Sequence, residues 1–406
     1  MTRAILLHVG CPKTGTSYLQ DVLFQNRVQL AEQGLLYPAE RFDGQFLAAL
    51  DLLQLKWGGL EAEAVGAWDE LARKAREWPG TVVISHEILA VATREQAMRA
   101  LESLGWPDRE IRIVVSARDL VRQIPAEWQE NVKHRRTFRY QRFLQQIQAP
   151  EPTGRVATWF WNVQDLPSII DRWAGDLDPA AVTVVTVPPP GAPKDLLWER
   201  FAGAFGLDGL RYERSTERAN PSLGVPESHL LRRINLRAVK LVEPMHYRPL
   251  VRELLAHQTL AKRSGSARLS VPDEVWTWAD GVAQQWVADL RERGVRVSGD
   301  LADLLPQPRQ GEYADPDVAD QTEVAAAAID VITALILEGV RLREVEAQLR
   351  RELEQATDDR GLGLRARERV YRSATQRPLG RKALGLYHRS RPVSYTHLTL
   401  PTNREV

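Results

Sequence analysis

A loop near the N-terminus has the residue types and spacing of a phosphate-binding turn. The apolar run from Ala4 leads into Gly10-Cys11-Pro12-Lys13-Thr14-Gly15-Thr16-Ser17, after which a helical pattern begins. Glycines let backbone N–H groups turn toward a ligand, and a helix N-terminus adds the positive end of its dipole. In nucleotide hydrolases a lysine directly follows the second glycine, whereas here Thr16 takes that place and Lys13 lies inside the loop. The loop therefore predicts an anion cradle without the lysine and Mg²⁺ arrangement of an ATPase.

Polar residues also follow two later apolar runs, in Ser85-His86-Glu87 and Ser116-Ala117-Arg118-Asp119. Ligands of an open parallel sheet bind beyond the carboxyl ends of its strands, so we expect these residues to converge on the loop. A guanidinium matches phosphate bidentately, which makes Arg118 a candidate phosphate ligand. His86 and Glu87 are candidate general bases, and in an extended segment only one of them faces an acceptor. The alternative is that both are structural and tether a helix N-terminus.

The segment Pro12-Lys13-Thr14-Gly15-Thr16-Ser17-Tyr18-Leu19-Gln20 resembles the 5′-phosphosulfate-binding loop of the sulfotransferase superfamily. The resemblance extends over about Met1 to Pro306 and is to bacterial, carbohydrate-sulfotransferase-like members with a P-loop fold. It implies transfer of a sulfuryl group from 3′-phosphoadenosine 5′-phosphosulfate to a hydroxyl or amine of a carbohydrate or small-molecule acceptor, without a metal.

The same resemblance implies a role for each residue of the loop. Lys13 is expected to neutralise charge on the oxygen that bridges sulfur and phosphorus as the nucleotide leaves. The residues expected to bind the phosphosulfate are Thr14, Gly15, Thr16 and Ser17. Family members with this style of loop more often use a glutamate as base, which favours Glu87 over His86.

The segment from Arg118 to Trp128 resembles the family's 3′-phosphate-binding segment but departs from it at one position. Eight residues after the arginine the family usually has a serine, and this chain has Ala126. A hydrogen bond to a charged group contributes roughly 1.5–3 kcal/mol, so its loss weakens donor affinity by about one to two powers of ten. Either donor binding is lost, or Arg122, one helical turn from Arg118, compensates.

Further segments bear on the nucleotide and the acceptor. The run Glu217 to Gly224 resembles a late loop that closes near the nucleotide, which makes Arg218 either a phosphate contact or a solvated arginine. Lys133-His134-Arg135-Arg136 with Arg139 and Arg142 is either an entrance for an anionic acceptor or a solvated helix face. Trp159-Phe160-Trp161 either stacks on a sugar ring or belongs to a buried cluster. Cys11 is expected to fill space rather than to act as a nucleophile.

Short apolar runs and helical patterns alternate along the chain. Four runs have the apolar character of strands buried in a parallel sheet: Ala4–Val9, Thr81–Ser85, Ile111–Ala117 and Val182–Val187. Helical spacing is found in Ser17–Gln33, Leu60–Trp78, Arg94–Leu104, Leu196–Phe205 and, broadly, Glu227–Arg293. This alternation predicts an α/β, P-loop-type three-layer sandwich with a central, mostly parallel sheet, followed by a helical region and a C-terminal tail helix.

Composition excludes several classes of protein. The chain has 406 residues, 44% of them apolar, with a net charge of +1 and a single cysteine. These values fit a globular protein without a disulfide framework or a multi-cysteine metal site, and they favour neither a nucleic-acid nor a membrane partner. The run after Arg3 is too short for a signal peptide, and we expect no membrane span and a cytoplasmic location.

The predicted organisation has four parts. Residues 1–306 form the sulfotransferase-like domain, 307–323 a polar linker, 324–392 a charged helical tail and 393–406 a segment of foreign origin. Val393 to Thr402 resembles a reading frame of a transposon-end adaptor used in sequencing libraries. In the tail, Leu342, Val345, Leu349 and Leu353 would form an apolar stripe, either a homodimeric coiled-coil seam or part of a helix packed on its own domain.

Two other functions compete with sulfuryl transfer. A small-molecule kinase or other nucleotide-binding P-loop protein is disfavoured by Thr16 after Gly15, and Asp119 is its nearest candidate for an acidic metal ligand. A catalytically silent sulfotransferase-like scaffold is favoured by Ala126. The acceptor and the oligomeric state do not follow from the sequence.

Overall fold

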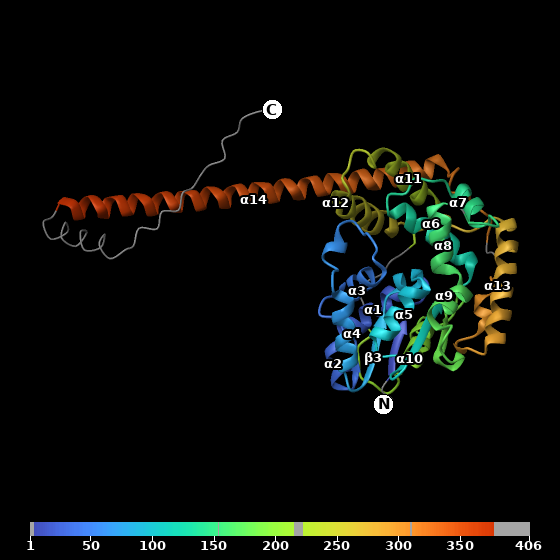
Figure 1. Cartoon of the computed structure of the whole chain (residues 1–406). Coiled ribbons are helices and arrows are strands. Elements are labelled where there is room, and N and C mark those ends of the chain that lie inside the picture. Colours follow the sequence, from blue (N-terminus) through green and yellow to red (C-terminus); the bar gives the residue numbers. More distant parts are fainter. Residues whose placement is uncertain (1–3, 153, 215–221, 309–310, 377–406) are drawn as a thin grey trace, which may run out of the picture. The chain divides into compact units, whose positions relative to one another are not determined.

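Six parallel strands form the centre of an α/β fold, as the sequence predicts. The computed structural model describes residues 4–152, 154–214, 222–308 and 311–376, with the side chains of 356–371 and 373–376 left out. The strands are β1 Ala4–His8, β2 Leu35–Leu36, β3 Thr81–Ser85, β4 Glu110–Ala117, β5 Val182–Thr186 and β6 Arg296–Ser298. They lie in the order β2-β3-β1-β4-β5-β6. Figure 1 shows helices packed around this sheet. The four predicted strands are confirmed, and the two edge strands were missed because two or three residues carry no periodicity.

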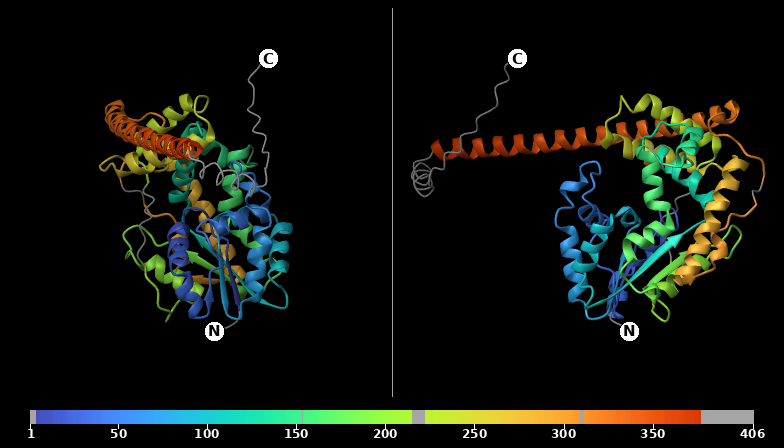
Figure 2. Two further views of the ribbon diagram at one scale, coloured as in Figure 1. Left: turned by 90° about the vertical axis from the view of Figure 1, so that its left-hand side faces the viewer. Right: turned by 45° about the vertical axis from the view of Figure 1, so that its right-hand side comes forward.

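Helices cover both faces of the sheet (Figure 2), because alternate side chains of each strand point to opposite faces. Ile5 and Leu7 of β1 belong to the larger core, whereas Leu6 between them belongs to a smaller one. The smaller core contains residues of α1 and α10, including Leu19 and Phe201. Burial on both faces explains why the strands are apolar throughout.

Helices lie in each segment that has helical spacing. The longer ones before β6 are α1 Thr16–Gln25, α2 Arg27–Glu32, α3 Gly44–Leu53, α4 Ala67–Glu77, α5 Arg94–Ser103, α6 Leu120–Lys133, α7 Tyr140–Ile147, α8 Arg155–Gln164, α9 Leu166–Ala174, α10 Leu196–Phe205, α11 Val225–Ala238 and α13 Asp273–Arg293. The shorter segments are η1 Leu60–Ala62, η2 Glu87–Val91, η3 Pro179–Ala181, α12 Pro244–Tyr247, the π-helical η4 Arg248–Thr259, η5 Leu260–Lys262 and η6 Leu301–Leu304. The last helix is α14 Gln321–Gln376. Helices α3 and α7 form in segments for which no helix was predicted.

Two predicted helices are interrupted. The helix expected over Ser17–Gln33 breaks at Asn26, whose side-chain amide donates to the backbone oxygen of Glu213 at 2.8 Å and accepts from its N–H at 2.9 Å. The helix expected over Leu60–Trp78 breaks at Gly66, which has a φ of 80°. The break at Gly66 depends on the local backbone conformation, and the break at Asn26 depends on a residue distant in sequence. The spacing of apolar residues indicates neither of them.

The chain divides into compact units of Met1–Ala334 and Leu335–Val406. In the first unit, Val324, Ala327 and Val331 at the start of α14 are buried. Leu342 and the other three residues of the predicted tail stripe are exposed. None of the helices in the described ranges is long and apolar enough to cross a bilayer. The segment from Val393 lies outside the described residues.

Candidate functional site

The loop Gly10–Ser17 leaves β1 at the centre of the sheet and enters α1. The N–H groups of Val9 and Cys11 each donate to an oxygen of β4 at 2.9 Å, so the start of the loop continues the strand pairing. Lys13 and Gly15 have positive φ values of 65° and 91°. Within the described ranges, no protein acceptor takes up the N–H groups of residues 13 and 15–17. These are the groups with which a helix N-terminus binds an anion.

A buried chain of hydrogen bonds fixes the loop from below. Thr14 Oγ1 donates to the oxygen of Cys11 at 2.6 Å, so it must accept from Ser116 Oγ, also at 2.6 Å. The Ser116 oxygen then accepts from His8 Nε2 at 2.9 Å, and His8 Nδ1 accepts from Ser85 Oγ at 2.8 Å. Burial lowers the pKa of His8 to about 4, which keeps the ring neutral with a single N–H. This series of hydrogen bonds holds β1, β3, β4 and the loop together.

Gly10 has no room for a side chain. A Cβ at this position would lie 2.0 Å from Ser116 Oγ and 2.6 Å from His8 Nε2. Ser116 and His8, a histidine that the sequence analysis did not single out, therefore together require this glycine.

Lys13 is held by a carboxylate of α6. Its Nζ lies 2.5 Å from Glu130 Oε2, with the two side chains 22% and 21% exposed. Glu130 also contacts His134 Nε2 at 3.0 Å and Arg252 at 3.4 Å. Burial acts to raise the pKa of Glu130, but His134 and Lys13 outweigh it and hold the pKa far below its usual range. An anionic ligand of Lys13 must therefore share or replace an ionised carboxylate.

Glu87 follows β3 and faces the start of α1. Its Oε2 accepts from Gln20 Nε2 at 2.8 Å. Burial acts to raise the pKa of Glu87, but His86, the backbone, Gln20 and Thr16 outweigh it and hold the pKa below its ordinary value. The carboxylate is ionised at neutral pH and lies next to the predicted donor loop.

His86 has a different place. Its Nδ1 accepts from the N–H of Ile88 at 3.2 Å and so caps η2. Burial lowers the pKa of His86, and the neutral ring carries its proton on Nε2. The lone pair that a general base would use is already engaged.

The two arginines of the predicted 3′-phosphate segment differ in their free donors. Arg118 donates to the oxygen of Arg122 at 2.8 Å, and its Nε is buried without a partner. Burial, reinforced by the charge of Arg122, lowers the pKa of Arg118 to about 10. Arg122 instead bonds Asp119 and the oxygens of Pro188 at 2.9 Å and Val187 at 3.4 Å. Arg118 therefore retains capacity for a phosphate, whereas Arg122 would have to exchange partners.

Glu127 is a buried acid that the sequence analysis missed. It lies on α6, is 4% exposed and accepts from Gln164 Nε2 at 3.2 Å. Burial raises the pKa of Glu127 to about 7; Lys13 and Arg118 oppose this rise, and Glu130 adds to it. Its interaction with both cations shows that the loop and the Arg118 segment share one electrostatic environment. No pattern in the sequence marks Glu127, because the orientation of α6 decides what this carboxylate meets.

Aromatic side chains connect the two ends of this site. Trp57, 36% exposed, packs against Phe46 with ring centroids 5.7 Å apart and lies 6.4 Å from the rings of Trp159 and His134. Phe46 lies 5.1 Å from the His86 ring. The contacts thus run from Lys13 through α6 and the aromatic residues to the end of β3, and from Glu87 to α1 through Gln20. We call the polar part of this arrangement, consisting of Lys13, Glu87, Arg118, Glu127 and Glu130, the loop site.

The remaining sequence predictions have separate outcomes. Cys11 is buried, and burial raises the pKa of its thiol to about 12, which fits a space-filling role. Phe160 is buried in the core, and Trp159 and Trp161 are partly buried against it. Arg218 lies outside the described residues. In the described ranges, no three histidine, cysteine or acidic side chains are grouped as metal ligands.

Comparisons with family models, with curated proteins and with solved structures give no match for this chain.

Proposed function

We propose that the chain is a sulfotransferase that moves a sulfuryl group from 3′-phosphoadenosine 5′-phosphosulfate to a hydroxyl or amine of a carbohydrate or small molecule. One observation carries the proposal. The adjacent parallel strands β3, β1 and β4 end in Glu87, the Lys13 loop and Arg118, in that order. A base, an anion cradle and a phosphate ligand thereby lie at one edge of the sheet, beyond the carboxyl ends of its strands.

The groups divide the reaction between them. The acceptor proton passes to the Glu87 carboxylate as the acceptor oxygen or nitrogen attacks sulfur. The bond from sulfur to the bridging oxygen breaks, and Lys13 stabilises the charge that develops on the leaving phosphate. Glu87 is the better base because the Nδ1 lone pair of His86 is occupied by Ile88.

The donor's two charged ends meet different surroundings. The phosphosulfate would bind the free N–H groups of residues 13 and 15–17 and draw Lys13 from Glu130. The 3′-phosphate would use the spare donors of Arg118, whose Nε has no partner. These donors offset the hydroxyl that is absent at Ala126.

A nucleotide kinase is the weaker candidate. Asp119, the acid nearest to a metal-ligand position, caps α6 through the N–H of Arg122 at 3.0 Å and pairs with the Arg122 guanidinium. A silent scaffold is favoured by one observation, the pairing of Lys13 with Glu130 in the free protein.

Calorimetry separates these candidates. The full chain is titrated with 3′,5′-bisphosphoadenosine and, separately, with ATP and Mg²⁺; we expect preference for the bisphosphate. Labelled donor is then offered with a panel of hydroxyl and amine acceptors. Lys13→Ala should lower turnover about 100- to 1,000-fold, as removal of a transition-state charge contact does, while Lys56→Ala, at an exposed lysine, should not. Preference for ATP would refute the proposal, and tight bisphosphate binding without transfer to any acceptor would favour the scaffold.

A further inference from the structure

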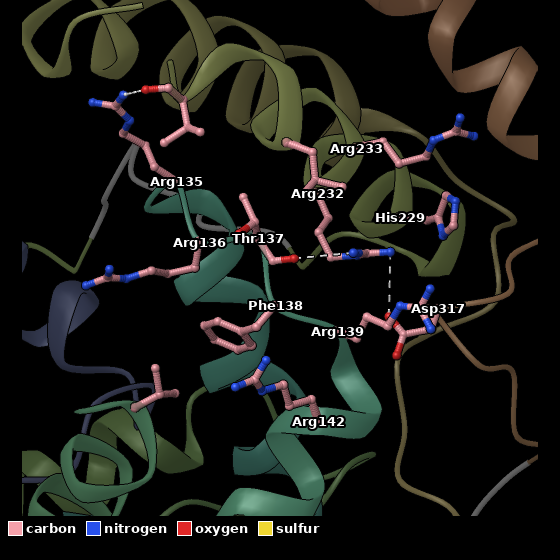
Figure 3. Close-up of a pocket in the computed structure, with 13 residues that line it drawn as sticks. Arg135, Arg136, Thr137, Phe138, Arg139, Arg142, His229, Arg232, Arg233 and Asp317 are labelled. Atoms are coloured by element: carbon pink, nitrogen blue, oxygen red, sulfur yellow. Dashed lines mark hydrogen bonds and ion pairs between the residues drawn. The ribbon is translucent and has the colours of Figure 1, made fainter. Parts of the chain in front are cut away.

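A basic hollow of about 950 Å³ lies among α7, α8, α11 and the segment after α6 (Figure 3). Six arginines line it: Arg135, Arg136, Arg139, Arg142, Arg232 and Arg233. Asp317 is the one carboxylate among its described lining residues. We call this hollow the arginine pocket. Its volume is within the range of about 300–1,000 Å³ typical of small-molecule sites.

Arg232 is a buried cation with too few partners. Its side chain is 8% exposed, donates to the Thr137 oxygen at 3.3 Å and lies 3.7 Å from Asp317. Its Nε is buried without a partner. A guanidinium has five N–H donors, and a buried charge is stable only when it is paired and hydrogen-bonded.

Neighbouring charges add to this imbalance. Burial lowers the pKa of Arg232; Asp317 opposes the shift, and the positive charges of Arg139 and Arg233 increase it. Figure 3 shows Arg139 next to the pair of Arg232 and Asp317. Asp317 is itself shared, because its Oδ2 accepts from the N–H of Gln141 at 3.0 Å.

The arginines at the rim of the pocket also have no acidic partner among the described residues. Arg136, Arg139 and Arg142 are exposed, and none forms an ion pair with a carboxylate of the described residues. Arginines elsewhere on the surface do: Arg73 contacts Glu77 at 2.5 Å, for example. For a chain with a net charge of +1, this is a local concentration of positive charge.

The lining indicates the chemistry of a ligand. Arginine forks match the oxygens of phosphate and sulfate, and several arginines that line one volume suit several such groups. Phe138, Val156 and Leu236 add apolar surface for a carbon skeleton. We propose that the arginine pocket binds a compact small molecule that carries several phosphate or sulfate groups.

The proposal does not depend on sulfuryl transfer. No residue of the loop site lines the arginine pocket. Each site can therefore be tested while the other is left intact.

The test is calorimetry on the full chain with three ligands that share one ring. Myo-inositol hexakisphosphate and myo-inositol hexasulfate should bind, more weakly as salt is added, and uncharged myo-inositol should not. The stronger of the two anions identifies the group that the pocket prefers. Arg139→Ala/Arg142→Ala should weaken binding at least tenfold and leave the binding of 3′,5′-bisphosphoadenosine unchanged.

A matched control removes the same charge elsewhere. Arg211→Ala/Arg291→Ala replaces two exposed arginines outside the pocket and should bind the inositol anions as the parent chain does. Arg232→Lys keeps the buried charge but removes the fork, and it should weaken binding without lowering the melting temperature as much as Arg232→Ala. Equal losses in the two double variants would overturn the proposal. So would tighter binding of a single-stranded oligonucleotide than of either inositol anion.

Discussion

The loop site and the arginine pocket both contain several charged side chains. Among the described residues of these two sites, only those of the loop site pair a cation with a carboxylate at close range. In the loop site Lys13 has Glu130 as its partner, Glu87 has Gln20, and the loop itself is held by the hydrogen bonds of His8 and Ser116. In the arginine pocket the described lining residues include six arginines and a single carboxylate, that of Asp317. A ligand of the loop site must exchange partners with the protein, whereas a ligand of the pocket supplies charge that the protein lacks.

This difference has opposite consequences for mutation. Removing an acid from the loop site should free a cation for the ligand. Removing a cation from the arginine pocket can only weaken binding. Three further predictions test the charges of the loop site and the packing beneath its loop. The first concerns Glu127, whose buried carboxyl has the most strongly raised pKa of the site.

The largest expected effect concerns Glu127, whose folded-state pKa of about 7 exceeds the ordinary glutamate value. The folded protein holds this proton more tightly than the unfolded chain. The resulting stability is fully present below about pH 4.5 and is lost as the pH rises through 7, by roughly 3 kcal/mol. Urea denaturation of Glu127→Gln at pH 4.5 to 8 should lack this loss. Glu102→Gln, at an exposed glutamate, is the control; a parental pH dependence in Glu127→Gln would contradict the prediction.

The second effect concerns the fit of the loop over His8. Gly10→Ala places a methyl group 2.6 Å from the backbone nitrogen of Ser116, which cannot move aside. We expect a loss of about 2 kcal/mol in the free energy of unfolding. Gly281→Ala, in α13 with no neighbour within 4 Å, should instead gain up to about 1 kcal/mol. Equal stability of the two variants would show that the loop is packed less tightly than the hydrogen bonds of His8 indicate.

The smallest effect concerns Glu130. Glu130→Gln removes the negative charge that competes for Lys13, and it should tighten bisphosphate binding about fivefold, corresponding to the roughly 1 kcal/mol of a partly exposed ion pair. Calorimetry measures this directly. Arg139→Ala, in the arginine pocket, should leave the same titration unchanged. Weaker binding by Glu130→Gln would mean that Glu130 positions Lys13 for the ligand instead of withholding it.

The fold was predictable from sequence where residues act through their neighbours in the chain. Buried parallel strands have apolar side chains on both faces, so four strand runs stood out. The edge strands β2 and β6 were not predicted, because their pairing depends on β3 and β5 and not on their own pattern. The break at Asn26 likewise depends on Glu213, which is distant in sequence.

For the loop site, sequence located the strand ends but not the partners. The loop, Glu87 and Arg118 follow three strands that proved to be adjacent. Glu130 and Glu127 were missed because they lie on a helix whose orientation decides what they meet. The engaged lone pair of His86 and the commitment of Arg122 to Pro188 also depend on backbone atoms that residue types do not reveal.

The histidine beneath the loop also constrains how related chains can diverge. Its ring occupies the space that a side chain at position 10 would need, and its two nitrogens require hydroxyls at positions 85 and 116. A lineage that keeps His8 should therefore retain glycine and both serines or close substitutes. A lineage that replaces His8 with a small apolar residue relaxes positions 85 and 116 together, so an alignment would show positions 8, 85 and 116 covarying even though they lie on three separate strands. Glycine at position 10 stays required, because the backbone nitrogen of Ser116 blocks a side chain there.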